Sequence, residues 1–350
     1  MRESGKWLAI AGLAVAVALP SVASAQDTVE GPEVSWRVST WGKERAFTAG
    51  IEKAAELISE RTDGRFQIEV VYGEALSKAR ENLDGIRIGA FESAMYCNFY
   101  HPGKMPASMV LTMPFLQLGN WDVSRDVREA VMNHPILKEK IDQWNARYYM
   151  SALLPQYEFL GAGDPPESID DWDGLRVRAG GGIGQAMEKL GASPTTVPAT
   201  ETYTSIDRGT IDAVSLPYTY SHASYQIPEV SDWFTSNMSP GTTECGTVLN
   251  KEAYNELPEE YQQLLEDVKE EAYQAQIQAY KEIDKVNLPN FREELTEITY
   301  DDAQIERFKE VAGQPVWDEW VEENQDDFDA QGLLDFVLEE IEKAQEKYEG

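Results

Sequence analysis

Arg178 is the residue whose type and position point most clearly to chemistry. It lies in a short apolar stretch, 175–179, that is predicted to form a strand, and a glycine-rich turn at 180–184 follows directly. An arginine beside the start of a helix can hold a carboxylate with two parallel N–H groups, and glycines let a ligand approach the backbone. The alternative is a structural arginine paired with a nearby acid. The spacing alone favours neither interpretation.

Familiar catalytic patterns are missing from the chain. The turn at 180–184 does not match the dinucleotide-binding pattern G-x-G-x-x-G, because Gln185 stands at the third glycine position. His101, His134 and His222 are far apart, and none belongs to an H-E-x-x-H pattern. There is no C-x-x-C, G-x-S-x-G or G-x-x-x-x-G-K-[ST] motif. The sequence therefore indicates no cofactor and no set of metal ligands.

Aromatic residues follow several of the predicted strands, where the walls of a ligand pocket are expected. Any single aromatic residue belongs more often to the core than to a ligand wall. The candidates are Trp36, Trp41, Tyr96, Phe99, Tyr100, Tyr157, Phe159, Tyr218 and Tyr220.

The first 25 residues have the three-part pattern of a secretory signal peptide. Arg2 and Lys6 supply a basic start, an apolar run ends at Pro20, and small residues at 23 and 25 precede a cleavage site after Ala25. The run is shorter than the roughly 20 apolar residues of a membrane anchor. The sequence thus predicts an exported, periplasmic protein.

Composition and charge limit the number of domains and the kinds of partner to expect. Removal of residues 1–25 from the 350 leaves 325, enough for two domains, and 42% apolar residues suffice for a core. Those 25 residues carry a net charge of +1, so the formal net charge of −32 becomes −33. Such a surface repels nucleic acid and anionic lipid, and it suits high salt. We therefore expect no nucleic-acid partner.

The chain has two cysteines, Cys97 and Cys245. Export permits a disulfide, but one bridge is optional for the stability of a chain of this length. The sequence favours two buried free thiols and leaves a disulfide as the alternative.

Strands and helices are predicted to alternate in two blocks, which favours two α/β lobes with a ligand in the crevice between them. One long helix is predicted over 257–286, broken by Pro289, and three acidic amphipathic helices follow from Asp301. The predicted strands are 34–40, 66–72, 90–97, 147–154, 175–179, 195–197 and 213–216. The other predicted helices are 43–61, 79–88, 122–132, 135–144, 183–190 and 201–208.

The middle of the chain resembles the DctP-type substrate-binding proteins of TRAP transporters. The segment DWDGLRVR at 171–178 is similar to the family pattern D-x-x-G-L-K-x-R, with Arg176 in place of lysine. Further similar segments lie before and after it in the family's order, with Ala213 in place of a final glycine in the fourth. They are MPFL at 113–116, LGASP at 190–194, ETY at 201–203, GTIDA at 209–213 and LPEE at 257–260.

The resemblance implies a two-lobed α/β periplasmic binding protein fold of type II-like topology, with hinge strands and a long bracing helix. It implies lobe I at 26–150, completed by roughly 240–300, lobe II at 151–239, and C-terminal helices at 301–350 packed on the lobes. It also implies that the lobes close on a small organic acid, which Arg178 binds through its carboxylate. Integral membrane subunits driven by an ion gradient would then receive the acid.

Three positions depart from the family's pattern. Glu158 stands where some members carry a second arginine, Leu216 replaces an asparagine, and Ala199 replaces an aromatic residue. An added acid suits a ligand with an amine, a sulfonium or a hydroxyl group, and the other two changes add space and apolarity. The expected ligand-binding residues are Arg178, Glu158, Tyr157, Trp41, Asn98, Tyr218, Leu216 and Ala199.

Two other functions stay open on the sequence. An exported α/β enzyme, a hydrolase or lyase, could use Glu158 or Asp212, although nucleophile and metal patterns are missing. A binding protein of an ATP-driven transporter is the other alternative.

Overall fold

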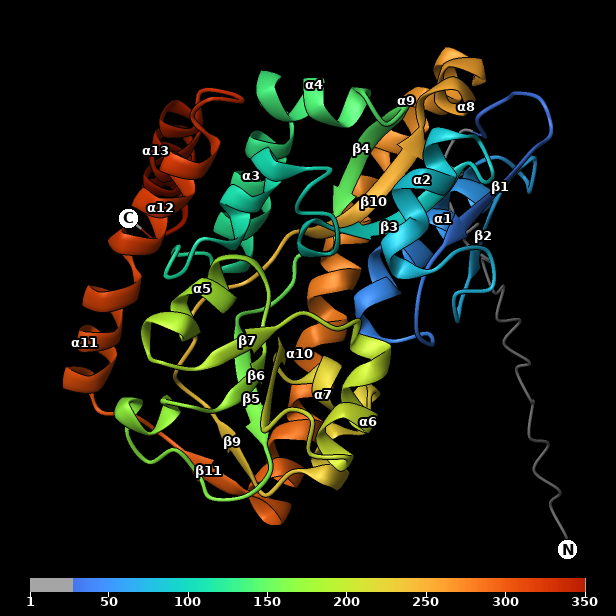
Figure 1. Ribbon diagram of the computed structural model, residues 1–350. Helices are drawn as coiled ribbons and strands as arrows, with labels where there is room; N and C mark the ends of the chain where they lie inside the picture. The colour runs from blue at the N-terminus through green and yellow to red at the C-terminus, as the bar shows by residue number, and fades with distance from the viewer. Residues whose placement is uncertain (1–27, 350) are drawn as a thin grey trace, which may run out of the picture.

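Two separate β-sheets organise the chain (Figure 1). The computed structural model describes residues 28–349. The five-stranded sheet has the order β2-β1-β3-β10-β4, and the six-stranded sheet has the order β11-β9-β5-β8-β6-β7. This arrangement confirms the predicted two-lobed α/β fold. The predicted signal peptide and its cleavage site lie outside the described residues.

The five-stranded sheet belongs to the first lobe. β1 runs parallel to β2 and β3, and β10 pairs antiparallel with β3 and β4. Along β1, the alternate residues Trp36 and Val38 are buried, as a strand with one face on the core requires. The helix α1 packs on β2 and on α10 through residues at helical spacing. The bounds are β1 (Val34–Ser39), β2 (Phe66–Val71), β3 (Ser93–Cys97), β4 (Ala146–Ser151), β10 (Cys245–Asn250), α1 (Ala49–Arg61), α2 (Asn82–Arg87), α3 (Trp121–Met132), α4 (Pro135–Asp142), α8 (Lys251–Glu256) and α9 (Glu259–Asp267).

The six-stranded sheet belongs to the second lobe. Its strand β6, which ends at Arg178, runs parallel to β7 and β8, and β5 pairs antiparallel with β8 and β9. The short helices α5 and α6 connect these strands. The bounds are β5 (Tyr157–Gly161), β6 (Arg176–Arg178), β7 (Ser193–Thr195), β8 (Ala213–Pro217), β9 (Trp233–Thr235), β11 (Thr296–Ile298), α5 (Gly181–Lys189), α6 (Thr202–Asp207) and α7 (Tyr220–Ser224).

Two strand connections and one helix link the lobes. The chain passes from β4 to β5 through 152–156 and returns from β9 to β10 through 236–244. The helix α10 (Lys269–Glu294) contacts α1 in the first lobe and α7 and β11 in the second, and it runs along both lobes in Figure 1. These are the hinge strands and the bracing helix that the resemblance implied.

Buried polar side chains fix the returning connection. The Arg128 guanidinium donates to the carbonyl oxygen of Thr243, at 2.8 Å, and to the Glu244 carboxylate. Both charged side chains are fully buried, so the ion pair is shielded from solvent. Thr243 also shares a hydrogen bond of 2.8 Å with the Tyr157 hydroxyl on β5. Helix α3 thus holds the connection that enters β10.

The prediction of one helix ended by Pro289 was wrong. The segment forms two helices, α9 and α10, and Pro289 lies inside α10, which continues to Glu294. Proline removes one N–H donor from a helix, which frees the carbonyl four residues earlier, at Lys285. Both residues are exposed, so solvent can hydrate that carbonyl and the helix continues.

Three C-terminal helices follow, as predicted. They are α11 (Asp302–Ala312), α12 (Gln314–Asn324) and α13 (Ala330–Glu349). The first two contact α5 in the second lobe, and α13 contacts α3 in the first (Figure 1). The C-terminal segment therefore packs on both lobes. None of the helices within residues 28–349 is both long and apolar enough to cross a lipid bilayer.

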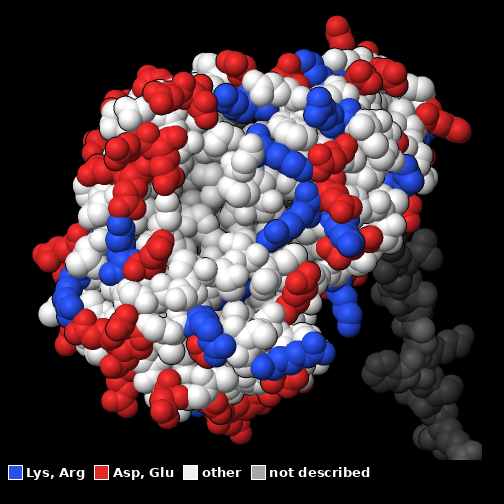
Figure 2. Space-filling view, viewed as in Figure 1, with Lys and Arg blue, Asp and Glu red and all other residues white. Residues whose placement is uncertain are grey.

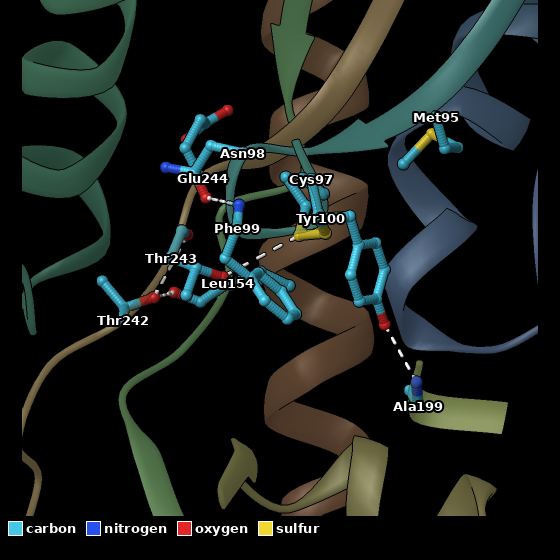
Figure 3. The surroundings of a disulfide bond; sticks show 12 residues. Met95, Cys97, Asn98, Phe99, Tyr100, Leu154, Ala199, Thr242, Thr243 and Glu244 are labelled. Carbon is cyan, nitrogen blue, oxygen red and sulfur yellow. Dashed lines mark hydrogen bonds between the residues drawn. A yellow bond between two sulfur atoms is a disulfide. The ribbon is translucent and has the colours of Figure 1, made fainter. Parts of the chain in front are cut away.

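Cys97 and Cys245 form a disulfide, which corrects the prediction of two free thiols (Figure 3). The two residues lie directly opposite each other on the neighbouring strands β3 and β10. They are separated by 148 residues in the sequence, so no local pattern reveals that they are partners.

Candidate ligand-binding site

A small, partly open cavity lies between the two lobes. Residues from both sheets line it, and most are aromatic or aliphatic. They are Trp41, Arg45, Phe47, Cys97, Phe99, Tyr100, Leu154, Tyr157, Arg178, Ala199, Leu216, Pro217, Tyr220, Ser221, Tyr225 and Cys245.

The topology places the cavity where the parallel strands end. Trp41 follows β1, Phe99 follows β3, Arg178 ends β6, and Leu216 stands at the end of β8. In open α/β sheets, the carboxyl ends of parallel strands meet at one edge, where ligands bind. The two lobes turn these edges toward each other.

Arg178 is the best-defined polar group of the cavity. Its side chain is only 1% exposed. Its Nε donates to the carbonyl oxygen of Val197 at 3.1 Å, and its Nη1 donates to that of Ser215 at 2.7 Å. Its buried Nη2 has no hydrogen-bond partner among the described residues. An unpaired buried donor costs about 1–3 kcal/mol, more for a charged group, so this site is built to receive an acceptor.

No acidic side chain neutralises Arg178. Among residues 28–349, no carboxylate forms an ion pair with it, and no aspartate or glutamate lines the cavity. The alternative of a structural arginine paired with an acid therefore fails. Figure 2 shows acidic side chains crowding the outline of the visible face, while its hollowed middle is mostly uncharged.

Five of the eight predicted ligand residues line the cavity together: Arg178, Tyr157, Trp41, Leu216 and Ala199. Burial raises the pKa of Tyr157, which keeps its hydroxyl protonated. The backbone N–H of Ala199 donates to the Tyr100 hydroxyl oxygen at 2.9 Å, which joins the second lobe to the first (Figure 3).

Glu158, which we predicted to meet a ligand, does not line this cavity. Successive side chains of a strand point to opposite faces, and Tyr157 already faces the cavity. The Glu158 carboxylate instead accepts hydrogen bonds from the Thr235 hydroxyl and from the backbone N–H and hydroxyl of Ser239. Burial raises its pKa, against the effect of these hydrogen bonds. It is a buried structural acid of the second lobe.

Asn98 and Tyr218 also lie outside the cavity lining. The Asn98 amide donates to the carbonyl oxygen of Ser108, and its oxygen accepts the N–H of Phe99, each at 2.8 Å, so it shapes the turn after β3. Tyr218 packs against Phe291 with ring centroids 6.5 Å apart, in the core of the second lobe.

The residues named for an alternative enzyme lie elsewhere too. Asp212 forms an ion pair with Arg176 at the half-exposed edge of the sheet, which lowers the pKa of its carboxyl. His222 is buried, with Nε2 3.1 Å from the carbonyl oxygen of Glu158, and burial lowers its pKa to about 3. Within residues 28–349, no cluster of histidine, cysteine or acidic residues could hold a metal ion.

Sequence reasoning missed three polar residues of the cavity, Arg45, Ser221 and Tyr225. Arg45 lies just before the short helical turn at 46–48 and Tyr225 just after α7, and the Arg45 guanidinium approaches the Tyr225 ring from the opposite lobe. The one local signal is Gly42, whose φ of +69° marks a left-handed turn just before Arg45. Phe99, Tyr100 and Tyr220 were candidate wall residues and do line the cavity.

Known proteins resemble this chain along most of its length. It is 25% identical over 319 residues to a monocarboxylate 2-oxoacid-binding periplasmic protein of Nostoc sp., covering 83% of this chain and 84% of that protein. It is 26% identical over 261 residues to the ectoine-binding periplasmic protein of Halomonas elongata, covering 70% and 72%.

Solved structures share the fold. A TRAP solute-binding protein of Rhodoferax ferrireducens, in complex with copurified benzoate, matches with a TM-score of 0.79 and 20% identity, covering 90% of this chain and 99% of that one. One from Bordetella bronchiseptica, with bound mandelate, matches with a TM-score of 0.76 and 20% identity, covering 89% and 99%.

The sequence model of one protein family matches residues 38–324, which include the second sheet, all of the first sheet except the start of β1, and the whole cavity lining. Its description is bacterial extracellular solute-binding protein, family 7. The chain belongs to this family, the DctP-type periplasmic solute-binding proteins of TRAP transporters.

Proposed function

We propose that this protein binds a small organic carboxylate in the cavity between its lobes. The observation that carries the proposal is Arg178, a buried cation whose Nη2 has no partner among the described residues. A ligand carboxylate supplies both the missing negative charge and the missing acceptor. A buried arginine of this kind is favourable only when a partner completes it.

The rest of the cavity suits a ligand with a compact, flat and largely apolar body. Trp41, Phe99, Tyr157 and Leu216 supply aromatic and aliphatic surface, as the walls of small-molecule sites commonly do. A polyhydroxylated sugar acid would leave many hydroxyl groups without partners here. Several similar proteins bind compact carboxylates, namely 2-oxoacids, benzoate and mandelate.

Delivery and location follow from the family. We infer that a signal peptidase cleaves after Ala25 and that the loaded protein passes its ligand to the integral membrane subunits of a TRAP transporter. The lobes would be 26–150 with roughly 240–300, and 151–239, with 301–350 packed across them. Binding requires no cofactor in this proposal.

Matched acids and amides test the proposal. Isothermal titration calorimetry would compare benzoate with benzamide and pyruvate with pyruvamide, because each amide keeps the shape and removes the charge. We expect at least one acid to bind and its amide to bind at least about 30-fold more weakly, as expected when a buried charge loses its partner. Equal binding of acid and amide, or no binding by any carboxylate of a wider panel, would overturn the proposal. Mass spectrometry of small molecules that copurify with the protein would supply the panel.

A further inference from the structure

The Tyr225 hydroxyl is a second unsatisfied polar group of the cavity. Tyr225 follows α7 in the second lobe and lines the cavity, and its hydroxyl oxygen is buried without a hydrogen-bond partner among the described residues. Burial raises the pKa of Tyr225 to about 12, against the opposing effect of Arg45 and Arg178. The phenol is therefore protonated at neutral pH and needs an acceptor for its proton.

The neighbours of this hydroxyl cannot provide that acceptor. Of the charged groups that act on it, Arg45 and Arg178 carry only donors, and the Glu74 carboxylate lies outside the cavity lining and accepts the backbone N–H of Ala79 instead. No acidic residue lines the cavity. Since no described residue hydrogen-bonds this hydroxyl, a ligand atom in the cavity would supply the acceptor.

Arg45 reaches the same place from the first lobe. Its Nη1 donates to the carbonyl oxygens of Trp41, at 2.8 Å, and Lys43, at 2.6 Å, which fixes one edge of the guanidinium. The guanidinium carbon lies 4.7 Å from the Phe47 ring centroid and 5.7 Å from that of Tyr225. Its Nε is buried and has no partner within the described part of the chain.

Gly42 makes this arrangement possible. A Cβ atom at position 42 would lie 2.9 Å from Arg45 Nη1 and 2.9 Å from the Tyr225 hydroxyl oxygen. Both groups therefore converge on one spot that only a glycine leaves open, and the glycine's φ of +69° favours the same residue. The side chains of Arg45 and Tyr225 come together there from opposite lobes.

We propose that Arg45 and Tyr225 form a second recognition point, which selects carboxylates that carry an additional oxygen acceptor, a hydroxyl or carbonyl oxygen. The inference rests on the proposed function, in which Arg178 takes the carboxylate itself. One carboxylate satisfies the Arg178 Nη2, and a further oxygen on the same ligand satisfies the Tyr225 hydroxyl and the Arg45 Nε. An acid without that oxygen leaves these donors buried and unpaired.

Matched ligand pairs test the inference. Phenylacetate and mandelate differ by one hydroxyl beside the carboxylate, and benzoate and 3-hydroxybenzoate differ by one on the ring. We expect the wild-type protein to bind the oxygenated member of at least one pair about tenfold or more tightly, because a site built to bond a hydroxyl rejects the analogue that lacks it. Equal binding within both pairs, or preference for the unsubstituted acids, would overturn the inference.

The variant Tyr225→Phe tests whether the Tyr225 hydroxyl binds the additional oxygen of the ligand. It should bring the affinity ratio of that pair close to one, because the hydroxyl that distinguishes the two acids is gone. Arg45→Lys, which loses the Nε donor, should reduce the ratio as well. Tyr254→Phe, outside the cavity, is the matched control and should keep the full ratio. A Tyr225→Phe protein that keeps the ratio would overturn the assignment.

The two proposals fail in different ways. If no carboxylate binds the wild-type protein, the proposed function fails. If carboxylates bind and depend on Arg178, but the paired acids bind equally, the second recognition point alone is wrong.

Discussion

The Arg178 guanidinium carbon lies 5.1 Å from the centroid of the Phe99 ring, although the two residues belong to different lobes. The ring covers the guanidinium from the first lobe, while the carbonyls of the second lobe hold two of its nitrogens. A desolvated contact of this kind contributes about 2 kcal/mol. Closure of the lobes therefore completes the surroundings of the arginine that we propose to bind the ligand.

Closure should be measurable, because lobes joined by hinge segments open and close around ligands. Small-angle scattering of the wild-type protein should show a smaller radius of gyration when a bound carboxylate saturates it. A radius that stays constant at saturation would count against a hinged cleft.

The variant Tyr100→Phe removes the acceptor of the Ala199 N–H and should weaken ligand binding roughly twofold to tenfold, in line with about 0.5–1.5 kcal/mol for one hydrogen bond.

Acid should destabilise the protein through His101. Burial lowers the pKa of His101 to about 4, from an ordinary value of 6.5. The unfolded chain takes up a proton below about pH 6.5 while the folded chain does not, so stability is present above that pH and is lost as the pH falls toward 4. At about 1.4 kcal/mol per pH unit, the loss by pH 5 is about 2 kcal/mol.

Denaturant titrations at pH 7 and pH 5 measure this contribution. The wild-type protein should lose about 2 kcal/mol more unfolding free energy than His101→Gln over the same pH change. Comparing the two proteins cancels the contributions of buried acids such as Glu158. Identical pH dependence would show that His101 titrates normally in the folded state.

The disulfide should contribute to stability. Cys97 and Cys245 are 148 residues apart, and the chain-entropy model gives a stabilisation of about 5 kcal/mol for so long a loop. The double variant Cys97→Ala, Cys245→Ala should have a free energy of unfolding lower by that amount. A reducing agent should lower the free energy of unfolding of the wild-type protein only. Alkylation of the denatured, unreduced protein should leave both cysteines unlabelled. Labelling of both would show that they are free thiols.

Salt should stabilise the folded protein. The full chain has a formal net charge of −32, so the acidic side chains on its surface repel one another. Salt screens this repulsion, because the Debye length falls from about 30 Å at 0.01 M salt to about 3 Å at 1 M. The Tm should rise with sodium chloride, with and without ligand, whereas binding to the enclosed Arg178 should weaken much less. A Tm that is constant from dilute buffer to molar salt would contradict an adaptation of the surface to salt.

Most of the fold could be predicted because alternating strands and helices leave a strong periodic signal. The strands that escaped prediction had none. β5 and β10 are buried on both faces and lack alternation, and β9 and β11 are only three residues long. The rule that proline ends a helix failed at Pro289, where solvent can compensate for the lost hydrogen bond.

The residues of the candidate site differ in the same way in how well the sequence predicts them. Arg178 could be recognised because a buried strand, a glycine-rich turn and a family motif coincide there. Glu158 was assigned to the ligand because the sequence did not reveal β5 as a strand. Without that strand, the sequence could not show that Glu158 and Tyr157 point to opposite faces. Arg45 and Tyr225 could not be found, because each acquires its role from a residue of the other lobe.

The most direct test of the account is calorimetry of Arg178 variants with a carboxylate that binds the wild-type protein. Arg178→Ala should lose at least about 30-fold in affinity, because removing one partner of a desolvated charge pair costs about 2–5 kcal/mol. Arg178→Lys should also fail, since a point charge cannot replace the planar fork. Arg176→Lys, two residues earlier on the same strand and half exposed, should bind like wild type. Arg178 variants that fold and bind within a few-fold of wild type would contradict the account.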